Sequence, residues 1–156
     1  MNPALLFMLT HFLFIFHSFL MSNVPVRSID GLTYVQGSPV DVTGDKPVVL
    51  ELWSSWCGPC VAVIPHVNEL SKRYPNISFV GVNTSEDERI VKKFIERMGD
   101  KMTYNVAVDT EGVMDYYMSS LNIRGIPHAL VFNKGKIIFS GHPAEPGFEA
   151  ALKSVQ

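Results

Sequence analysis

Cysteine is scarce in this chain of 156 residues, which contains only Cys57 and Cys60. A structural zinc site needs four ligands, usually from two such pairs, and there is no second pair. Two cysteines also cannot build the disulfide framework of a small secreted domain. A purely structural disulfide is disfavoured too, because so short a ring constrains the unfolded chain little.

Clusters of positive charge are also missing. The 13 Lys and Arg residues are spread along the chain and are outnumbered by 15 Asp and Glu residues, for a net charge of −2. Phosphate backbones are bound by concentrated positive charge, so we expect no nucleic-acid partner. The length fits a single domain with a sizeable core.

Charge is absent from the first part of the chain. Residues 1–26 contain no Asp, Glu, Lys or Arg, and residues 5–21 are almost wholly apolar. This pattern is typical of a signal peptide or a short membrane anchor, although no basic residue precedes the run and no Ala-X-Ala site follows it. The alternative is a misassigned start, with Met21 as the first residue. We therefore interpret residues 1–22 as a signal peptide, an anchor or a misassigned start, and expect membrane contact only there. A start at Met1 predicts the secretory pathway or an extracytoplasmic location, and a start at Met21 predicts the cytoplasm.

The two cysteines lie at the end of the most apolar strand pattern in the rest of the chain. Residues 48–53 are an apolar, β-branched run typical of a strand buried on both faces. A helix that begins at about Cys57 would place this thiol where free backbone N–H groups favour a thiolate, and Cys60 one turn later. The pKa of Cys57 is therefore expected to fall below about 8.5. A Cys-X-X-Cys pair at such a junction indicates a redox-active dithiol.

Strand and helix patterns alternate after this junction. We predict helices near residues 60–73, 85–98, 113–121 and 146–155, strands at 77–82, 104–108, 128–132 and 136–139, and an extra strand or hairpin within 26–46. In the first helix, Asn68 falls off the apolar face. Ser85 and Glu88 fit the capping-box pattern at the start of the second helix. Alternating elements that end in a hairpin and a helix predict an α/β fold.

Two segments resemble known active-site segments. Trp-Ser-Ser-Trp-Cys-Gly-Pro-Cys at 53–60 resembles the active-site segment of thioredoxins, and Arg-Gly-Ile-Pro at 124–127 resembles their cis-proline loop. The 70 residues between Cys57 and Pro127 include an added helix-strand unit, which is similar to the TlpA/ResA-type, redoxin-like branch of thiol-disulfide oxidoreductases. The resemblance implies a thioredoxin-like α/β fold for residues 23–156: a central mixed sheet flanked by helices, with a helix-strand insertion between the Cys-X-X-Cys motif and the cis-proline loop.

The resemblance also implies roles for particular residues. Glu51 lies between two leucines of the buried strand, so burial should raise its pKa. At the corresponding place thioredoxins carry a buried acid that exchanges protons with the second cysteine; alternatively, Glu51 reaches solvent or a lysine. ResA-like proteins often carry a further acid three residues after the second cysteine, where this chain has Val63. The implied site residues are Cys57 as nucleophile, Cys60 as resolving cysteine, Glu51 for proton transfer, Trp56, Ile126 and Pro127 for substrate binding, and His128, which either tunes the thiolate or points to solvent.

These residues predict a thiol-disulfide oxidoreductase of the protein-disulfide reductase type. It would act on a protein disulfide or dithiol, require no metal or organic cofactor, and be recycled by a redox partner. One alternative is a copper or metal chaperone with His128 as a third ligand, although such proteins usually separate their cysteines by three residues. The other is a redoxin with thiol peroxidase-like activity, although peroxidatic sites have a Thr-X-X-X-Cys setting.

Overall fold

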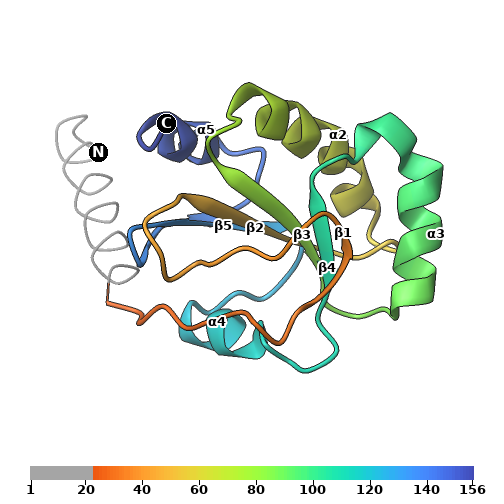
Figure 1. Cartoon of the computed structure of the whole chain (residues 1–156), viewed down its shortest axis with the longest axis horizontal. Helices are drawn as coiled ribbons and strands as arrows, with labels where there is room; N and C mark the ends of the chain where they lie inside the picture. Colours follow the sequence, from red (N-terminus) through yellow and green to blue (C-terminus); the bar gives the residue numbers. More distant parts are fainter. Residues whose placement is uncertain (1–22) are drawn as a thin grey trace, which may run out of the picture.

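The computed structural model describes residues 23–156, so the interpretation of residues 1–22 lies outside the described residues. A mixed sheet of six strands is flanked by helices, as predicted (Figure 1). In chain order the elements are β1 (Thr33–Gln36), β2 (Val48–Trp53), α2 (Gly58–Arg73), β3 (Ser78–Asn83), α3 (Glu88–Met98), the 3₁₀ turn η1 (Gly99–Lys101), β4 (Asn105–Val108), α4 (Asp115–Ser120), β5 (His128–Asn133), β6 (Lys136–Gly141) and α5 (Pro146–Lys153). Among these described helices, none is both long and apolar enough to cross a membrane.

The sheet order is β1-β4-β3-β2-β5-β6. Strands β2, β3 and β4 run parallel to one another, whereas β1, β5 and β6 each run antiparallel to their neighbours. The extra strand predicted within residues 26–46 is therefore β1, which pairs with the edge of β4. The interval between the cysteine motif and Pro127 contains most of α2, then β3, α3, η1, β4 and α4, and the predicted helix-strand unit corresponds to α3 and β4.

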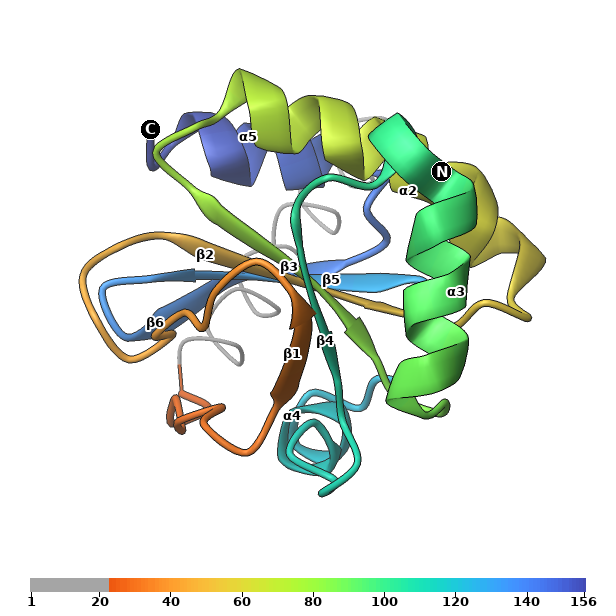
Figure 2. The same ribbon diagram turned by 45° about the vertical axis from the view of Figure 1, so that its right-hand side comes forward.

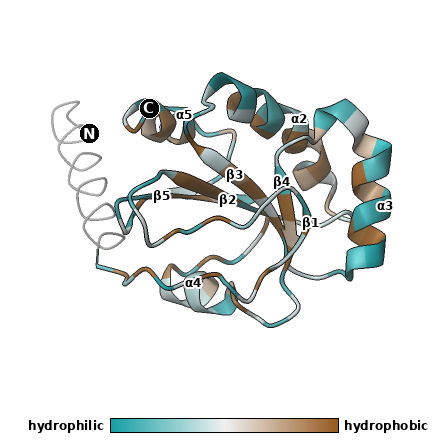
Figure 3. Ribbon diagram, in the orientation of Figure 1, coloured by the Kyte–Doolittle hydropathy of each residue, from teal (hydrophilic) through white to brown (hydrophobic). Residues whose placement is uncertain are grey.

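Helices cover the two faces of the sheet unequally. Helices α2, α3 and α5 pack over one face, while α4 and the chain around β1 cover the other (Figures 1 and 2). Apolar residues are concentrated on the central strands and on the inner sides of the helices, as Figure 3 shows. The first face buries apolar residues of three helices: Ile64 and Val67 of α2, Val91 and Phe94 of α3, and Phe148 and Leu152 of α5.

Strand β2 lies near the middle of the sheet and carries the cysteine motif at its carboxyl end. All six of its residues are buried. It is hydrogen-bonded to β3 on one side and β5 on the other, with Glu51 opposite Gly81 and Ala129. Paired on both edges, β2 gives the following loop a rigid starting point.

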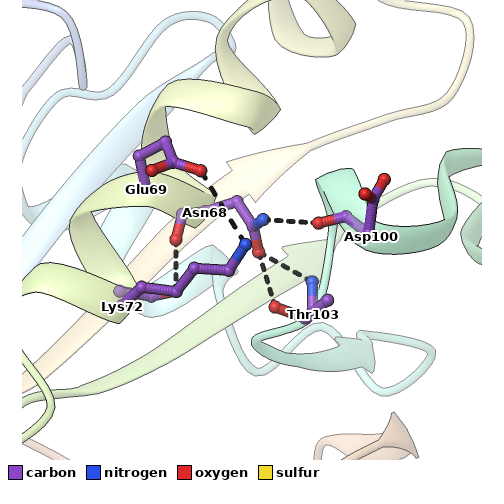
Figure 4. Close-up of polar contacts among 6 residues, drawn as sticks. Asn68, Glu69, Lys72, Asp100 and Thr103 are labelled. Carbon is purple, nitrogen blue, oxygen red and sulfur yellow. Dashed lines mark hydrogen bonds and ion pairs between the residues drawn. The ribbon is translucent and has the colours of Figure 1, made fainter.

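The prediction for Asn68 was wrong. This side chain is buried, not exposed, because it holds α2 against the chain between η1 and β4 (Figure 4). Its Nδ2 donates to the carbonyl oxygen of Asp100 at 2.8 Å, and its Oδ1 accepts from the backbone and hydroxyl of Thr103 at 2.8 and 2.9 Å. An amide with this set of partners replaces an apolar residue on the buried side of the helix without an unpaired polar atom.

The capping-box prediction was also wrong. The N-cap of α3 is Asp87, whose carboxylate accepts from the backbone N–H of Ile90 at 3.0 Å. Ser85 and Glu86 lie before the helix and form hydrogen bonds to residues on the cysteine loop. Local spacing favoured a cap, but long-range hydrogen bonds determine where these side chains lie.

Candidate active site

Cys57 is the N-cap of α2. Its backbone is extended, and the N–H of Cys60 donates to its Sγ at 3.2 Å. Gly58 and Pro59 occupy the first helical positions, where a proline has no hydrogen bond to lose. The two cysteines form a disulfide. The predicted start of the helix at about Cys57 is therefore confirmed, and the sulfur lies at the positive end of the helix dipole.

The loop before β5 lies against this disulfide. The Ile126–Pro127 peptide bond is cis, as the resemblance implied. The Sγ of Cys57 lies 3.9 Å from the carbonyl oxygen of Ile126, a contact that becomes a hydrogen bond only when Cys57 carries a thiol proton. The predicted partners Cys57, Ile126 and Pro127 are thus brought together across the 70-residue interval.

Trp56 is the most exposed large apolar side chain in residues 23–156. Its relative exposure is 69%, and its Nε1 donates to Ser85 Oγ at 3.1 Å. An indole anchored at one edge and open to solvent on its faces offers apolar area to a partner. Its role in substrate binding stays a prediction.

Trp53 is fully buried and stacks against Phe94, with ring centroids 4.9 Å apart. Its Nε1 has no hydrogen-bond partner among the described residues. Such an unpaired buried donor is unusual in a core.

Glu51 is fully buried and, within residues 23–156, is the only carboxylate in that condition. Side chains alternate along a strand, and its neighbours Val49 and Trp53 pack in the same core cluster as Cys60. Glu51 therefore points to the side of the sheet that α2 covers, and the alternative in which it reaches solvent or a lysine is wrong.

The surroundings of Glu51 favour its neutral form. Burial raises its pKa to about 8, although a hydrogen bond from the hydroxyl of Tyr104 at 3.5 Å acts to lower it. Burial and the neighbouring carboxyl together raise the pKa of Tyr104 well above its ordinary value, so this hydroxyl stays protonated. The Oε1 of Glu51 has no hydrogen-bond partner in the described part of the chain. A carboxyl with these properties can take up and release a proton near neutral pH.

His128 follows the cis proline and is half-buried. Its Nε2 is 2.8 Å from Ser140 Oγ, and burial lowers its pKa. It therefore does not simply point to solvent. Across residues 23–156, no group of three or more His, Cys, Asp and Glu side chains is arranged to hold a metal ion.

A polar network that sequence reasoning missed lies beside the cysteine loop. Glu86 accepts from the backbone N–H and hydroxyl of Ser55, at 2.7 and 2.5 Å, and from Asn83 Nδ2 at 2.7 Å. Ser54 and Ser85 share a hydrogen bond of 2.6 Å. No periodic pattern signals the contacts of Ser54 and Ser55 with Ser85 and Glu86, because these contacts join residues about thirty positions apart.

Comparison with known proteins agrees with this geometry. Residues 44–138 match the family model described as Thioredoxin-like, which covers more than half of the chain. The chain belongs to the thioredoxin-like family. The sheet, the dithiol at the start of α2 and the cis proline opposite it form the framework of the candidate site in this thioredoxin-like protein.

Curated relatives add a more specific likeness. The thiol-disulfide oxidoreductase ResA of Geobacillus kaustophilus is 29% identical over 116 residues, a match that covers 71% of this chain and 64% of that protein. The ResA of Geobacillus thermodenitrificans is 28% identical over the same shares. The thioredoxin-like chain thus spans less than two thirds of these relatives.

Solved structures resemble the fold. A thiol-disulfide isomerase from Corynebacterium glutamicum superposes with a TM-score of 0.69 at 21% identity, covering 85% of this chain and 96% of that one. The thioredoxin domain of a thiol-disulfide oxidoreductase from Bacteroides vulgatus gives 0.69 at 22% identity, covering 86% and 98%.

Proposed function

We propose that this thioredoxin-like chain is a thiol-disulfide oxidoreductase that acts on protein disulfides through Cys57 and Cys60. The observation that carries the proposal is the disulfide at the N-terminus of α2, with the Sγ of Cys57 3.9 Å from the carbonyl oxygen of Ile126. The likeness to proteins named thiol-disulfide oxidoreductase ResA supports the reaction class.

Substrate binding uses the exposed side of this arrangement. An extended segment of a target protein would pair with the backbone at Ile126, which Pro127 holds in place, and would lie against the exposed ring of Trp56. Backbone pairing of this kind tolerates many target sequences, because it reads no side chain.

The first chemical step is attack by Cys57. Its thiolate forms a bond to one sulfur of the target disulfide, the target S–S bond breaks, and the released target thiolate takes a proton. The helix N-terminus stabilises the attacking thiolate.

The second step releases the target. Cys60 passes its proton to the Glu51 carboxylate and attacks the Cys57 sulfur; the bond to the target breaks, and the second target thiolate takes a proton. The enzyme dithiol loses two electrons, which the target disulfide gains. With a pKa of about 8, Glu51 is ionised in roughly one tenth of molecules at pH 7 and is available as a proton donor in the rest, so it serves the reaction in either direction.

No metal or organic cofactor enters these steps, and the oxidised dithiol is returned to its reduced form by a recycling partner that carries a dithiol of its own. The copper-chaperone alternative has less support. It requires His128 as the third copper ligand, and the Nε2 of this residue is already hydrogen-bonded to the hydroxyl of Ser140.

Insulin reduction in the presence of dithiothreitol tests the proposal. The wild-type protein should accelerate precipitation of the insulin chains, and Cys57→Ser should abolish the effect. An inactive wild type or a fully active Cys57→Ser would contradict the proposal.

The role of Glu51 is tested separately. Glu51→Gln should slow release of the target from the mixed disulfide about 10²-fold, the lower end for lost general acid-base catalysis, and leave attack by Cys57 nearly unchanged. Glu69→Gln is the matched control, because this side chain is 67% exposed on the outer side of α2. Equal release rates in the two variants would exclude proton transfer by Glu51.

A further inference from the structure

The short segment between β2 and Cys57 is held from one side by the loop that follows β3. Asn83 is the last residue of β3 and lies opposite Trp53 in the parallel ladder. The two loops thus leave neighbouring strands at the same level of the sheet, where the carboxyl ends of parallel strands meet. Their side chains can meet without any distortion of the sheet.

Glu86 is the centre of this contact. Its Oε2 accepts from the N–H of Ser55 and from Asn83 Nδ2, both at 2.7 Å, and its Oε1 accepts from the hydroxyl of Ser55 at 2.5 Å. The Oδ1 of Asn83 in turn accepts from the backbone N–H groups of Ser85 and Glu86, at 3.1 and 2.9 Å. We call these contacts of Glu86 with Ser55 and Asn83 the clamp. Hydrogen bonds to a carboxylate are stronger than hydrogen bonds between neutral groups, so the clamp holds the two loops firmly together.

The surroundings of Glu86 favour the ionised form of its carboxyl. Burial acts to raise the pKa of Glu86, but the hydrogen bonds from Ser55 and Asn83 outweigh it, and the pKa lies below its ordinary value. All three donors therefore face a carboxylate at neutral pH.

Ser85, which precedes Glu86, extends the clamp to the two residues that flank Ser55. Ser85 Oγ contacts Ser54 Oγ at 2.6 Å and accepts from Trp56 Nε1 at 3.1 Å. The carbonyl oxygen of Ser54 accepts from the N–H of Cys57 at 3.2 Å, which completes the turn into α2. Residues 54–56 are thus tied to the loop after β3 at each position.

We infer that Glu86 is a positioning residue for the dithiol: through Ser55 it fixes the turn that sets the Cys57 sulfur at the N-terminus of α2. This inference rests on the proposed function, because it assigns Glu86 to the same site. It requires no contact between Glu86 and the target protein.

Two effects of removing the carboxylate have opposite signs. Loss of a nearby negative charge alone favours the Cys57 thiolate and lowers the pKa of this thiol. Loss of positioning moves the sulfur from the helix N-terminus and raises that pKa. The direction of the shift in the pKa of Cys57 therefore separates positioning, whose loss raises this pKa, from simple electrostatics, whose loss lowers it. A role of Glu86 in stability alone would not raise this pKa.

The experiment is alkylation of the reduced protein by iodoacetamide as a function of pH, with mass spectrometry to assign the modified cysteine. In Glu86→Gln the rate at pH 7 should fall about threefold to tenfold, with the pKa of Cys57 raised. Ser55→Ala, which keeps the charge and loses one hydrogen bond, should give a smaller change in the same direction. Glu88→Gln is the matched control: it removes the same charge two residues away, where the carboxylate pairs with Lys92 at 2.9 Å.

An unchanged or lowered pKa of Cys57 in Glu86→Gln would overturn the inference. Thermal melting of each variant checks folding; if Glu86→Gln does not fold, an unchanged rate in Ser55→Ala overturns it instead. The assay uses no protein substrate. A failure of insulin reduction by the wild type is therefore distinguishable from a failure of the clamp.

Discussion

The two faces of the central sheet differ in whether their buried polar atoms have hydrogen-bond partners. On the face covered by α4, the hydroxyl of Tyr117 is fully paired: it donates to the carbonyl oxygen of Arg27 at 2.5 Å and accepts from the N–H of that residue at 2.8 Å. On the face covered by α2, Glu51 and Trp53 each bury a polar atom that has no partner within residues 23–156. Unpaired buried groups are costly, and the proposed proton transfer gives such a group a use at Glu51, whereas no chemical role is assigned to the Trp53 N–H. The face covered by α2, here called the site face, thus carries the proposed site together with both unpaired atoms.

Strand β2 contributes side chains to both faces, so substitutions at adjacent residues of β2 test the two faces separately. Leu52→Ala alters the face covered by α4. Leu52 is fully buried there, and the cavity should lower the free energy of unfolding by about 2–5 kcal/mol. Urea denaturation of the oxidised protein measures this loss. Leu52→Met, which keeps the volume, should lose less than about 1.5 kcal/mol; similar losses in both variants would contradict a tightly packed face.

The pH dependence of stability tests the site face. Unfolded chains release the Glu51 proton at its ordinary pKa of 4.5, but the folded protein retains it up to about 8. Between these values the folded state binds more protons, so the free energy of unfolding should fall as pH rises and level off above pH 8. The slope is about 1.4 kcal/mol per pH unit.

Glu51→Gln should remove this slope. The check is the difference between wild-type and variant unfolding curves from pH 5.5 to 7.5, which should change by roughly 2–3 kcal/mol. A difference that is constant with pH would mean that Glu51 titrates normally in the folded protein.

Asn68 is a buried polar residue on the site face with all of its partners present. Asn68→Ala should lower the free energy of unfolding by about 1–3 kcal/mol, because the Asp100 carbonyl and the Thr103 N–H lose their bonds. Glu69→Gln, next to it but exposed, should change stability by less than about 0.5 kcal/mol. Equal values in chemical denaturation would show that water replaces the Asn68 bonds at no cost.

The smallest effect is expected from Tyr104→Phe. The 3.5 Å hydrogen bond to Glu51 is long, and its loss should raise the pKa of Glu51 by a fraction of a pH unit. Infrared titration of the protonated carboxyl band measures the shift. A lowered pKa would mean that the Tyr104 hydroxyl stabilises the neutral carboxyl of Glu51 and not its carboxylate.

Much of the framework was predictable because it depends on local pattern. The apolar run of β2, the start of α2 at Cys57 and the hairpin of β5 and β6 all follow from periodicity and turn chemistry. The cis bond at Pro127 came from a resemblance, since no local property of Ile126 and Pro127 determines it.

The parts that sequence reasoning missed depend on distant partners. Asn68 falls on a polar position of the helical pattern and is buried only because Asp100 and Thr103 pair with it. Glu86 belongs to a stretch rich in capping residues, yet its partner Ser55 lies 31 positions earlier. Patterns within one helix or strand contain no information about such contacts.

The burial of Cys60 has a practical consequence. This sulfur is fully buried, while Cys57 retains 7% exposure beside the open ring of Trp56. Under the proposed mechanism, a target would therefore bond covalently only to Cys57, and only Cys60 would release it from within. A Cys60→Ala protein would keep each client it attacks as a stable one-to-one adduct, which can be isolated under non-reducing conditions and identified by mass. The difference in exposure between the two sulfurs thus makes Cys60→Ala a direct way to search for the protein targets that the proposal requires.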